Sequence, residues 1–389
     1  MKLHEHEKLL LEALKAGLQG GQASWDGAEE ACITELSQLA RNHKVLPVVY
    51  QAVSGSSDLD LSAIRRQATV QVARQTQMSQ GALAVYDHMV SRGLHPLILK
   101  GAVCRWLYPV PDCRISGDED LYIPAREFEP GCDALTEMGL TPRDDKRESW
   151  IAPGRSVHIE LHRDLFVSPH LTEHSLEELF AQGFSETEVY EVEPGRLVCS
   201  FSPHLHFLYL ILHAYKHFLF SGFGIRQICD VGLWVKQYCD RIDWERLYRE
   251  CDQVHALYFA AAVFQIARGV LGISFELPAP WENVDVDPEP LLRDVLDAGI
   301  YGSATSVRLH SAVAMGGKAG NPIRTLFPDK EYMMSKYPQC SGREHMLPLM
   351  WARRLGEYGI EVLKKKEDPF GSVALAKKRQ KLLRLYKVI

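Results

Sequence analysis

The sequence has few features of a secreted or metal-stapled protein. Its nine cysteines are scattered along 389 residues, and no two of them have C-x-x-C spacing. An odd number of cysteines without paired spacing argues against a disulfide framework and against a cysteine-based zinc site. We therefore expect reduced thiols and a cytoplasmic protein.

The sequence also lacks an apolar run long enough to cross a bilayer, which needs roughly 20 residues. The most apolar stretch, residues 207–220, is interrupted by His213, Lys216 and His217. Glu5 and Glu7 lie where a signal peptide would carry no acid. We expect neither a signal peptide nor a membrane partner.

An excess of positive charge is missing as well, since the formal net charge is −6. This balance argues against a general nucleic-acid binder, although it leaves room for a local basic cleft. Hydrophobic residues make up 46% and charged residues 24%, as in an ordinary globular protein. The length suits two or three domains.

The pattern along the chain divides it into three regions. Residues 1–90 predict helices at about 9–18, 28–42 and 61–92, the last ending at Gly93. Residues 91–200 predict a mixed α/β domain, with short strands at about 94–99, 120–123, 149–152 and 156–162 and helices at 102–108 and 126–138. Residues 201–389 predict a helical domain, with helices at about 203–220, 224–238, 244–250, 257–271, 289–298, 345–364 and 373–387. The predicted fold class is α+β, a small mixed sheet framed by helical regions.

Two aspartates, Asp118 and Asp120, lie one residue apart just ahead of a short apolar run. In a strand, positions i and i+2 share a face, so these carboxylates would lie roughly 6.5 Å apart at Cα. Like charges that close repel and raise a pKa unless a cation lies between them. Mg²⁺ with carboxylate ligands is the usual cation, and it usually acts on phosphate. A solvated acidic turn is the alternative.

Residues 157–162 alternate strictly between apolar and polar side chains, which places His158, Glu160 and His162 on one strand face. Glu160 would complete a three-carboxylate site for two divalent ions if its strand lay beside the aspartates. A zinc hydrolase site made of His158, Glu160 and His162 is a second interpretation, and a half-exposed strand is a third. His213 and His217 have the i, i+4 spacing of metal ligands, although satisfied histidines on a partly buried helix are the better interpretation.

The order of these motifs resembles the nucleotidyltransferase superfamily that includes DNA polymerase beta. The resemblance is closer to its bacterial branch of uncharacterised nucleotidyltransferases, and it covers about residues 80–360. The motifs that carry it are Leu99-Lys100-Gly101, Tyr108-Pro109, Arg114, Asp118-x-Asp120, Ile159-Glu160-Leu161-His162, Arg226 to Asp230, Asp243-Trp244, Leu326-Phe327-Pro328 and Arg353.

The resemblance implies a Mg²⁺-dependent enzyme that transfers a nucleoside monophosphate from an NTP to a hydroxyl group and releases pyrophosphate. Asp118, Asp120 and Glu160 would be the catalytic metal ligands, with two ions expected. The substrate-binding residues would be Lys100, Gly101, Arg114 and His162. Two of these residues have an alternative to substrate binding. Arg114 would form a salt bridge to Asp112 or Asp118, and His162 would have a structural role. The acceptor is a small molecule, a protein or peptide, or an RNA end, and the acidic charge balance favours the first two.

Two positions depart from the superfamily pattern. Ala102 follows Gly101 where a serine is usual, and Glu119 separates the aspartates where an apolar residue is usual. Glu119 would point away from the metals, so we expect either a partly open face or a cationic partner there. These departures motivate a second hypothesis, a non-catalytic relative that binds a nucleotide or a protein.

Overall fold

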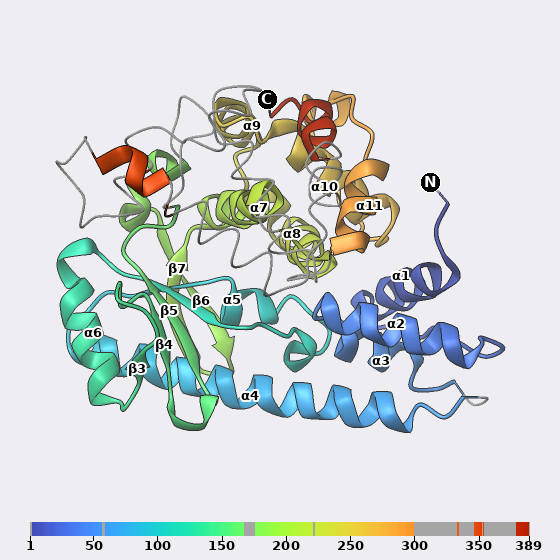
Figure 1. Cartoon of the computed structure of the whole chain (residues 1–389), viewed down its shortest axis with the longest axis horizontal. Coiled ribbons are helices and arrows are strands. Elements are labelled where there is room, and N and C mark those ends of the chain that lie inside the picture. The colour runs from blue at the N-terminus through green and yellow to red at the C-terminus, as the bar shows by residue number, and fades with distance from the viewer. Residues whose placement is uncertain are drawn as a thin grey trace.

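The structure is a computed structural model that describes residues 2–56, 59–166, 176–220, 222–298, 333, 346–351, 353 and 379–388. Figure 1 shows a small sheet with helices on both sides. The order of helices and strands agrees with the α+β fold expected from the sequence.

The N-terminal region is helical. It consists of α1 (Glu5–Leu18), α2 (Glu30–Asn42), α3 (Leu46–Val53) and α4 (Ser62–Ser91). The long helix α4 is followed by Gly93, whose φ of +77° suits a residue that turns the chain after a helix. The sequence reasoning missed α3, which has a proline in its first turn.

Five short strands form the main sheet, in the spatial order β1-β2-β5-β4-β3. Their bounds are Leu97–Leu99 for β1, Glu119–Tyr122 for β2, Thr141–Pro142 for β3, Ser149–Ile151 for β4 and His158–His162 for β5. The central pair, β2 and β5, is parallel, whereas the pairs β1–β2, β4–β5 and β3–β4 are antiparallel. Helix α5 (Gly101–Arg105) follows β1, and α6 (Phe128–Glu137) lies between β2 and β3.

A two-stranded hairpin, β6 (Thr187–Glu193) with β7 (Arg196–Phe201), lies beside the main sheet and was not predicted. The hydroxyl of Ser200 in β7 donates a hydrogen bond of 2.6 Å to the carbonyl of Ile98 in β1. The hairpin therefore touches the strand that leads into Lys100.

The C-terminal region is helical again. It contains α7 (Pro203–Phe220), α8 (Ile225–Tyr238), α9 (Trp244–Gln253), α10 (Leu257–Gly269) and α11 (Glu289–Ala298), close to the predicted ranges. Asp243 caps α9, because its side chain accepts a hydrogen bond from the backbone N–H of Arg246.

The two faces of the main sheet have different neighbours. Leu121, Ile159 and Leu161 are fully buried, and α4 and α6 pack on their side of the sheet. Asp120, Glu160 and His162 alternate with them and lie on the side of α7, which runs on the opposite side of the sheet from α4 (Figure 1). One apolar core runs through the described residues from α1 to α11.

Part of the C-terminal prediction lies outside the described residues. This applies to the motif at 326–328, most of the expected helix at 345–364 and the first part of the helix at 373–387, of which residues 379–385 are helical. No helix in the described part of the chain combines the length and the hydropathy needed to cross a membrane.

Candidate functional site

Strand register brings two of the three predicted carboxylates together, while Asp118 precedes β2 and lies outside this register. In the parallel pair, Asp120 of β2 is the register partner of Glu160 of β5. On the other side of β2, Leu99 is the partner of Asp120, so Lys100 follows at the end of the neighbouring strand. Forty residues of chain separate Asp120 from Glu160, and only the sheet makes them neighbours.

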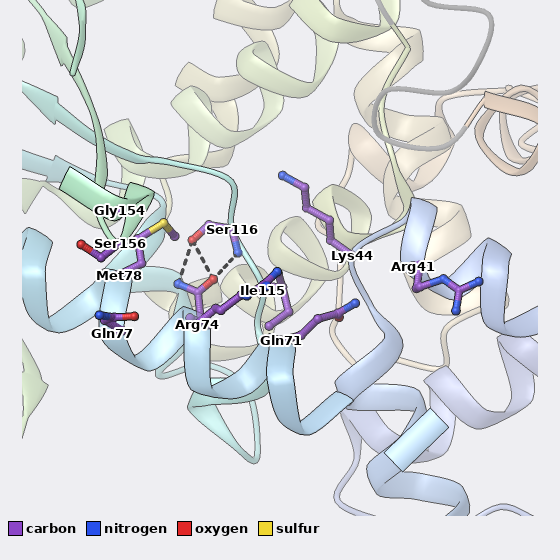
Figure 2. Close-up of a pocket in the computed structure, with 11 residues that line it drawn as sticks. Arg41, Lys44, Gln71, Arg74, Gln77, Met78, Ile115, Ser116, Gly154 and Ser156 are labelled. Atoms are coloured by element: carbon purple, nitrogen blue, oxygen red, sulfur yellow. Dashed lines mark hydrogen bonds between the residues drawn. The ribbon is translucent and has the colours of Figure 1, made fainter. Parts of the chain in front are cut away.

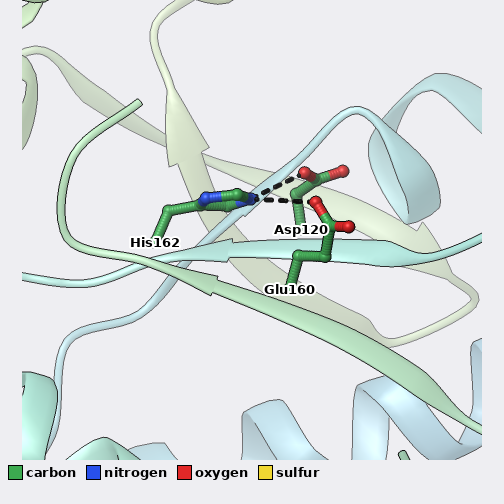
Figure 3. Close-up of side chains that lie close together, drawn as sticks. All are labelled: Asp120, Glu160 and His162. Carbon is green, nitrogen blue, oxygen red and sulfur yellow. Dashed lines mark hydrogen bonds and ion pairs between the residues drawn. The ribbon is translucent and has the colours of Figure 1, made fainter. Parts of the chain in front are cut away.

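Asp120, Glu160 and His162 form a compact cluster in which one ligand atom from each lies within 4.8 Å of the others (Figure 3). The Nε2 atom of His162 lies 2.9 Å from an Asp120 oxygen and 3.5 Å from a Glu160 oxygen. Burial lowers the pKa of His162, but hydrogen bonds to both carboxylates outweigh it and raise that pKa to about 9. His162 is therefore placed to orient the two carboxylates.

The alternative zinc trio does not assemble. His158 lies outside the cluster, with its two ring nitrogens 2.9 Å from the Ser149 hydroxyl and 3.2 Å from the Gly117 carbonyl. Asp120 takes its place beside Glu160 and His162. The geometry thus favours a carboxylate-rich site over one made of His158, Glu160 and His162.

The three carboxylates have different electrostatic surroundings. Burial and the charge of Asp120 raise the pKa of Asp118. Burial would also raise the pKa of Asp120, but Lys100 and His162 hold it below its usual range. The hydrogen bond from His162 lowers the pKa of Glu160. Neighbouring cations therefore offset the negative charge of Asp118 less than those of Asp120 and Glu160.

Lys100 provides the cation nearest to the cluster. Its ammonium lies 2.8 Å from an Asp120 oxygen and donates a hydrogen bond of 2.9 Å to Nε2 of His213. Burial lowers the pKa of Lys100, but Asp120 raises it above its ordinary value. An ammonium group has no acceptor, so His213 must present a neutral nitrogen. This agrees with burial holding the pKa of His213 well below its usual range.

The backbone of Lys100 is held in an uncommon conformation. Its φ is +53°, a region that non-glycine residues rarely adopt. The Lys100 N–H donates a 3.2 Å hydrogen bond to Nε2 of His206, whose other nitrogen lies 3.0 Å from the Ser200 hydroxyl. Because Ser200 donates to Ile98, it accepts from His206, so His206 is neutral with its proton on Nδ1. Burial accordingly lowers the pKa of His206 to about 3.

Further cations surround the carboxylates. Lys44 lies against Gly117 and interacts with the charge of Asp118, while burial lowers the Lys44 pKa to about 8. Lys216 projects from α7, where its charge interacts with Asp120 and Glu160 and burial lowers its pKa. Arg226 of α8 donates a 3.0 Å hydrogen bond to the Ile115 carbonyl. The sequence reasoning missed Lys44, Lys216, His206 and His213 as members of the site.

Arg114 occupies a different place from the one expected of a triphosphate ligand. It is 1% exposed, and two of its nitrogens lie 2.9 and 2.8 Å from the two oxygens of Asp230 in α8. The Tyr108 hydroxyl donates to the same carboxylate at 2.8 Å. Because the Arg114 guanidinium already pairs with Asp230, it joins the loop before β2 to α8. Its carboxylate partner is neither Asp112 nor Asp118.

Gly101 and Glu119 are explained together. A Cβ on Gly101 would lie 1.5 Å from a Glu119 oxygen, so the missing side chain makes room for this carboxylate. Glu119 is 1% exposed and points away from the cluster, where Arg105 pairs with it at 3.1 Å and the Ser116 hydroxyl donates to it at 2.9 Å. The expectation of a cationic partner is confirmed, and that partner is Arg105.

The donor set fits a hard divalent ion. Carboxylate oxygens are the ligands that Mg²⁺ prefers, and Asp120 and Glu160 offer them from partnered positions of adjacent strands, with Asp118 one residue before β2. The charged partners of Asp120 are Lys100 and His162, and the charged partner of Glu160 is His162.

Comparison with known proteins agrees with this geometry. The family model described as an uncharacterised nucleotidyltransferase matches residues 29–272, a span that includes both strands of the cluster and helices α7 and α8. No curated protein and no solved structure matches the chain. The matched span covers more than half of the sequence, and the chain therefore belongs to this family of uncharacterised nucleotidyltransferases.

Proposed function

We propose that this protein is a Mg²⁺-dependent nucleotidyltransferase that transfers a nucleoside monophosphate from an NTP to a hydroxyl group of an acceptor and releases pyrophosphate. The register that places Asp120 beside Glu160 is the observation that carries this proposal. We also propose a cytoplasmic location, in keeping with the free cysteines among the described residues.

Asp118, Asp120 and Glu160 would hold two Mg²⁺ ions. When bound, such ions neutralise the triphosphate and lower the pKa of the attacking hydroxyl. His162 keeps Asp120 and Glu160 oriented through its two contacts.

The chain's own cations would bind the nucleotide. Lys100 and Lys216 place positive charge over the carboxylates from the side of α7, which favours binding of a triphosphate. Tyr209 is buried beside Lys100, 5.9 Å from ring centroid to ammonium, and helps to exclude water from this side of the site. We assign the binding and orientation of the phosphates to Lys100 and Lys216.

The test is to replace Asp120 by asparagine, which keeps the shape and removes the charge. We expect wild-type protein to bind ATP or GTP only with Mg²⁺ and to release pyrophosphate when an acceptor is present. Asp120→Asn should lose both properties while its circular dichroism spectrum stays that of a folded protein. Pyrophosphate release by Asp120→Asn at the wild-type rate would refute the site.

The same experiment distinguishes an active nucleotidyltransferase from a non-catalytic relative that only binds a nucleotide. Wild-type protein that binds Mg²⁺·NTP but releases no pyrophosphate with any acceptor would favour it. The position of Glu119 removes one motive for this alternative, because its carboxylate faces Arg105 and not the cluster.

A further inference from the structure

A polar cavity lies close to the loop that carries Asp118. It has a volume of about 530 Å³ and lies between α4, the loop before β2 and the turn before β5 (Figure 2). Its lining includes Arg41, Lys44, Gln71, Arg74, Gln75 and Ser116. A cavity of this size can hold a small organic molecule.

The charge of this pocket is entirely positive. Arg41, Lys44 and Arg74 line it, and none of its lining residues is acidic. The Arg41 guanidinium contacts the amide oxygens of Gln67 and Gln38, so no carboxylate neutralises it there. Arg74 is exposed and makes no ion pair with any residue that the structure describes. In a chain with a net charge of −6, such a concentration of cations in a concave surface attracts anions.

Polar groups complete the pocket. The Oε1 atom of Gln71 is buried and has no hydrogen-bond partner, so it is available to accept a hydrogen bond from a ligand hydroxyl. Gln75 is 2% exposed and rigidly held, since its side-chain oxygen accepts a 2.6 Å hydrogen bond from the backbone N–H of Ser116. The pocket thus offers cations for an anionic group and an acceptor for a hydroxyl.

The pocket and the carboxylates share one loop. Ile115 and Ser116 line the pocket, and Asp118 follows two residues later. Lys44 lines the pocket and also lies against Gly117, where its charge interacts with Asp118. Lys44 therefore connects the pocket with the segment that carries Asp118.

We propose that this pocket binds the acceptor, and that the acceptor is a small molecule with a phosphate or carboxylate group and at least one hydroxyl. This inference rests on the proposed nucleotidyltransferase function. The anionic group binds Arg41 and Arg74, and the hydroxyl faces the carboxylates. The acceptor oxygen forms a bond to the α-phosphorus, the bond from that phosphorus to the pyrophosphate oxygen breaks, and the hydroxyl proton passes to water.

Binding of simple probes tests the pocket without the natural acceptor. We would titrate glycerol 3-phosphate, glycerate and glycerol into the full-length protein by calorimetry, with EDTA and without nucleotide. The variants are Arg74→Gln, Asp120→Asn and the control Arg65→Gln. Arg65 is an exposed arginine nine residues earlier on α4, on the opposite side of the helix, and its replacement changes the charge equally.

We expect at least one of the two anionic probes to bind wild-type protein and glycerol not to bind. Arg74→Gln should weaken anion binding about tenfold or more, since a charge-assisted contact is lost. Arg65→Gln and Asp120→Asn should bind the anion as wild type does, and Arg74→Gln should keep its affinity for Mg²⁺·ATP. Preference between glycerol 3-phosphate and glycerate then identifies the anionic group.

The inference is overturned if neither anion binds wild-type protein, or if Arg74→Gln and Arg65→Gln lose the same amount of affinity for the anion. It is also overturned if Arg74→Gln loses affinity for Mg²⁺·ATP together with its affinity for the anion. This last result would assign the pocket to the nucleotide. Failure of the proposed function has a different signature, because Mg²⁺·ATP would then not bind wild type although the anionic probe does.

Discussion

The three carboxylates of the site, although close in space, contribute differently to stability. The ionised form of Asp118 is disfavoured by burial and by Asp120, whereas Lys100 and His162 favour the ionised form of Asp120. Repulsion between two neighbouring aspartates would by itself make neutralisation of either one stabilising. The structure separates the two cases.

Asp118→Asn should leave the free energy of unfolding unchanged or raised in EDTA, because it removes repulsion. Asp120→Asn should lower it by about 3 kcal/mol, since it leaves the buried Lys100 without its carboxylate. Urea denaturation of both variants at neutral pH measures the difference. Equal stability of the two variants would contradict this charge balance.

The buried pair of Glu119 and Arg105 allows a second test at this scale. Arg105→Met should destabilise the protein by about 3–5 kcal/mol, because Glu119 remains buried without a cation. Adding Glu119→Leu should recover most of that loss, as an apolar pair of similar volume replaces the ion pair. Urea denaturation of the single and double variants gives the coupling, and Mg²⁺·ATP binding by the double variant serves as the control. A double variant no more stable than Arg105→Met would rule out this account.

At the scale of elements, the hairpin and α7 act together as a support for the end of β1. Ser200 of β7 and His206 of α7 hold the backbone of Lys100, while His213 of α7 holds its ammonium. A non-glycine residue at a positive φ costs of the order of 1–3 kcal/mol, and this support offsets that cost.

His206→Leu should therefore lower both the free energy of unfolding and the affinity for Mg²⁺·NTP. In the His206→Leu background, Lys100→Gly should lower the stability further, because the loss of the ammonium that pairs with the buried Asp120 outweighs the relief of backbone strain by glycine. It should not restore nucleotide binding, because the ammonium is gone. Thermal unfolding and nucleotide titration measure the two effects separately. Recovery of binding along with stability would show that the ammonium of Lys100 is dispensable.

The chemistry-bearing elements were predictable, but most of their neighbours were not. Alternation in residues 157–162 is a local pattern, and it predicted a strand there correctly, whereas Asp118 lies one residue before β2 and not within the strand. The partner of Arg114 could not be read locally, because Asp230 is 116 residues away in the sequence. His213 and Lys216 were visible only as polar residues on an apolar helix, and only packing shows that they face Lys100 and the carboxylates.

At the scale of the whole molecule, buried polar ties join the three expected regions. Arg114 and Asp230 join the loop before β2 to α8, and His43 after α2 accepts a 3.2 Å hydrogen bond from the backbone N–H of Ile225. The tie of Arg114 to Asp230 crosses the boundary expected near residue 200, and the tie of His43 to Ile225 crosses those expected near residues 90 and 200. We expect the three regions to unfold as one cooperative unit.

His43 also makes the stability of the molecule depend on pH. Burial lowers its pKa from an ordinary 6.5 to about 4. Between pH 6.5 and about pH 4, the His43 imidazole is protonated in the unfolded chain but neutral in the folded protein. Lowering the pH through this range therefore reduces the free energy of unfolding. His43→Asn keeps an acceptor near Ile225 and should reduce the pH dependence by up to about 1.4 kcal/mol per pH unit.

Urea titrations from pH 7.5 to pH 4.5 measure this effect. His255→Asn is the matched control, because His255 is exposed and asparagine tolerates its positive φ. The control should keep the wild-type slope. An unchanged slope in His43→Asn would assign the acid sensitivity to other groups.

The pairing of Lys100 with His213 has a consequence for synthesis. A ribosome makes Lys100 more than a hundred residues before His213, and the partner of Arg114 follows later still. A nascent chain that stops after β7 carries the carboxylates but lacks the α7 cations and the α8 anchor. Nucleotide binding should thus begin only once α8 has left the exit tunnel, which ribosome-bound chains of increasing length can test. The order of translation itself would delay chemistry until the chain can hold its substrate.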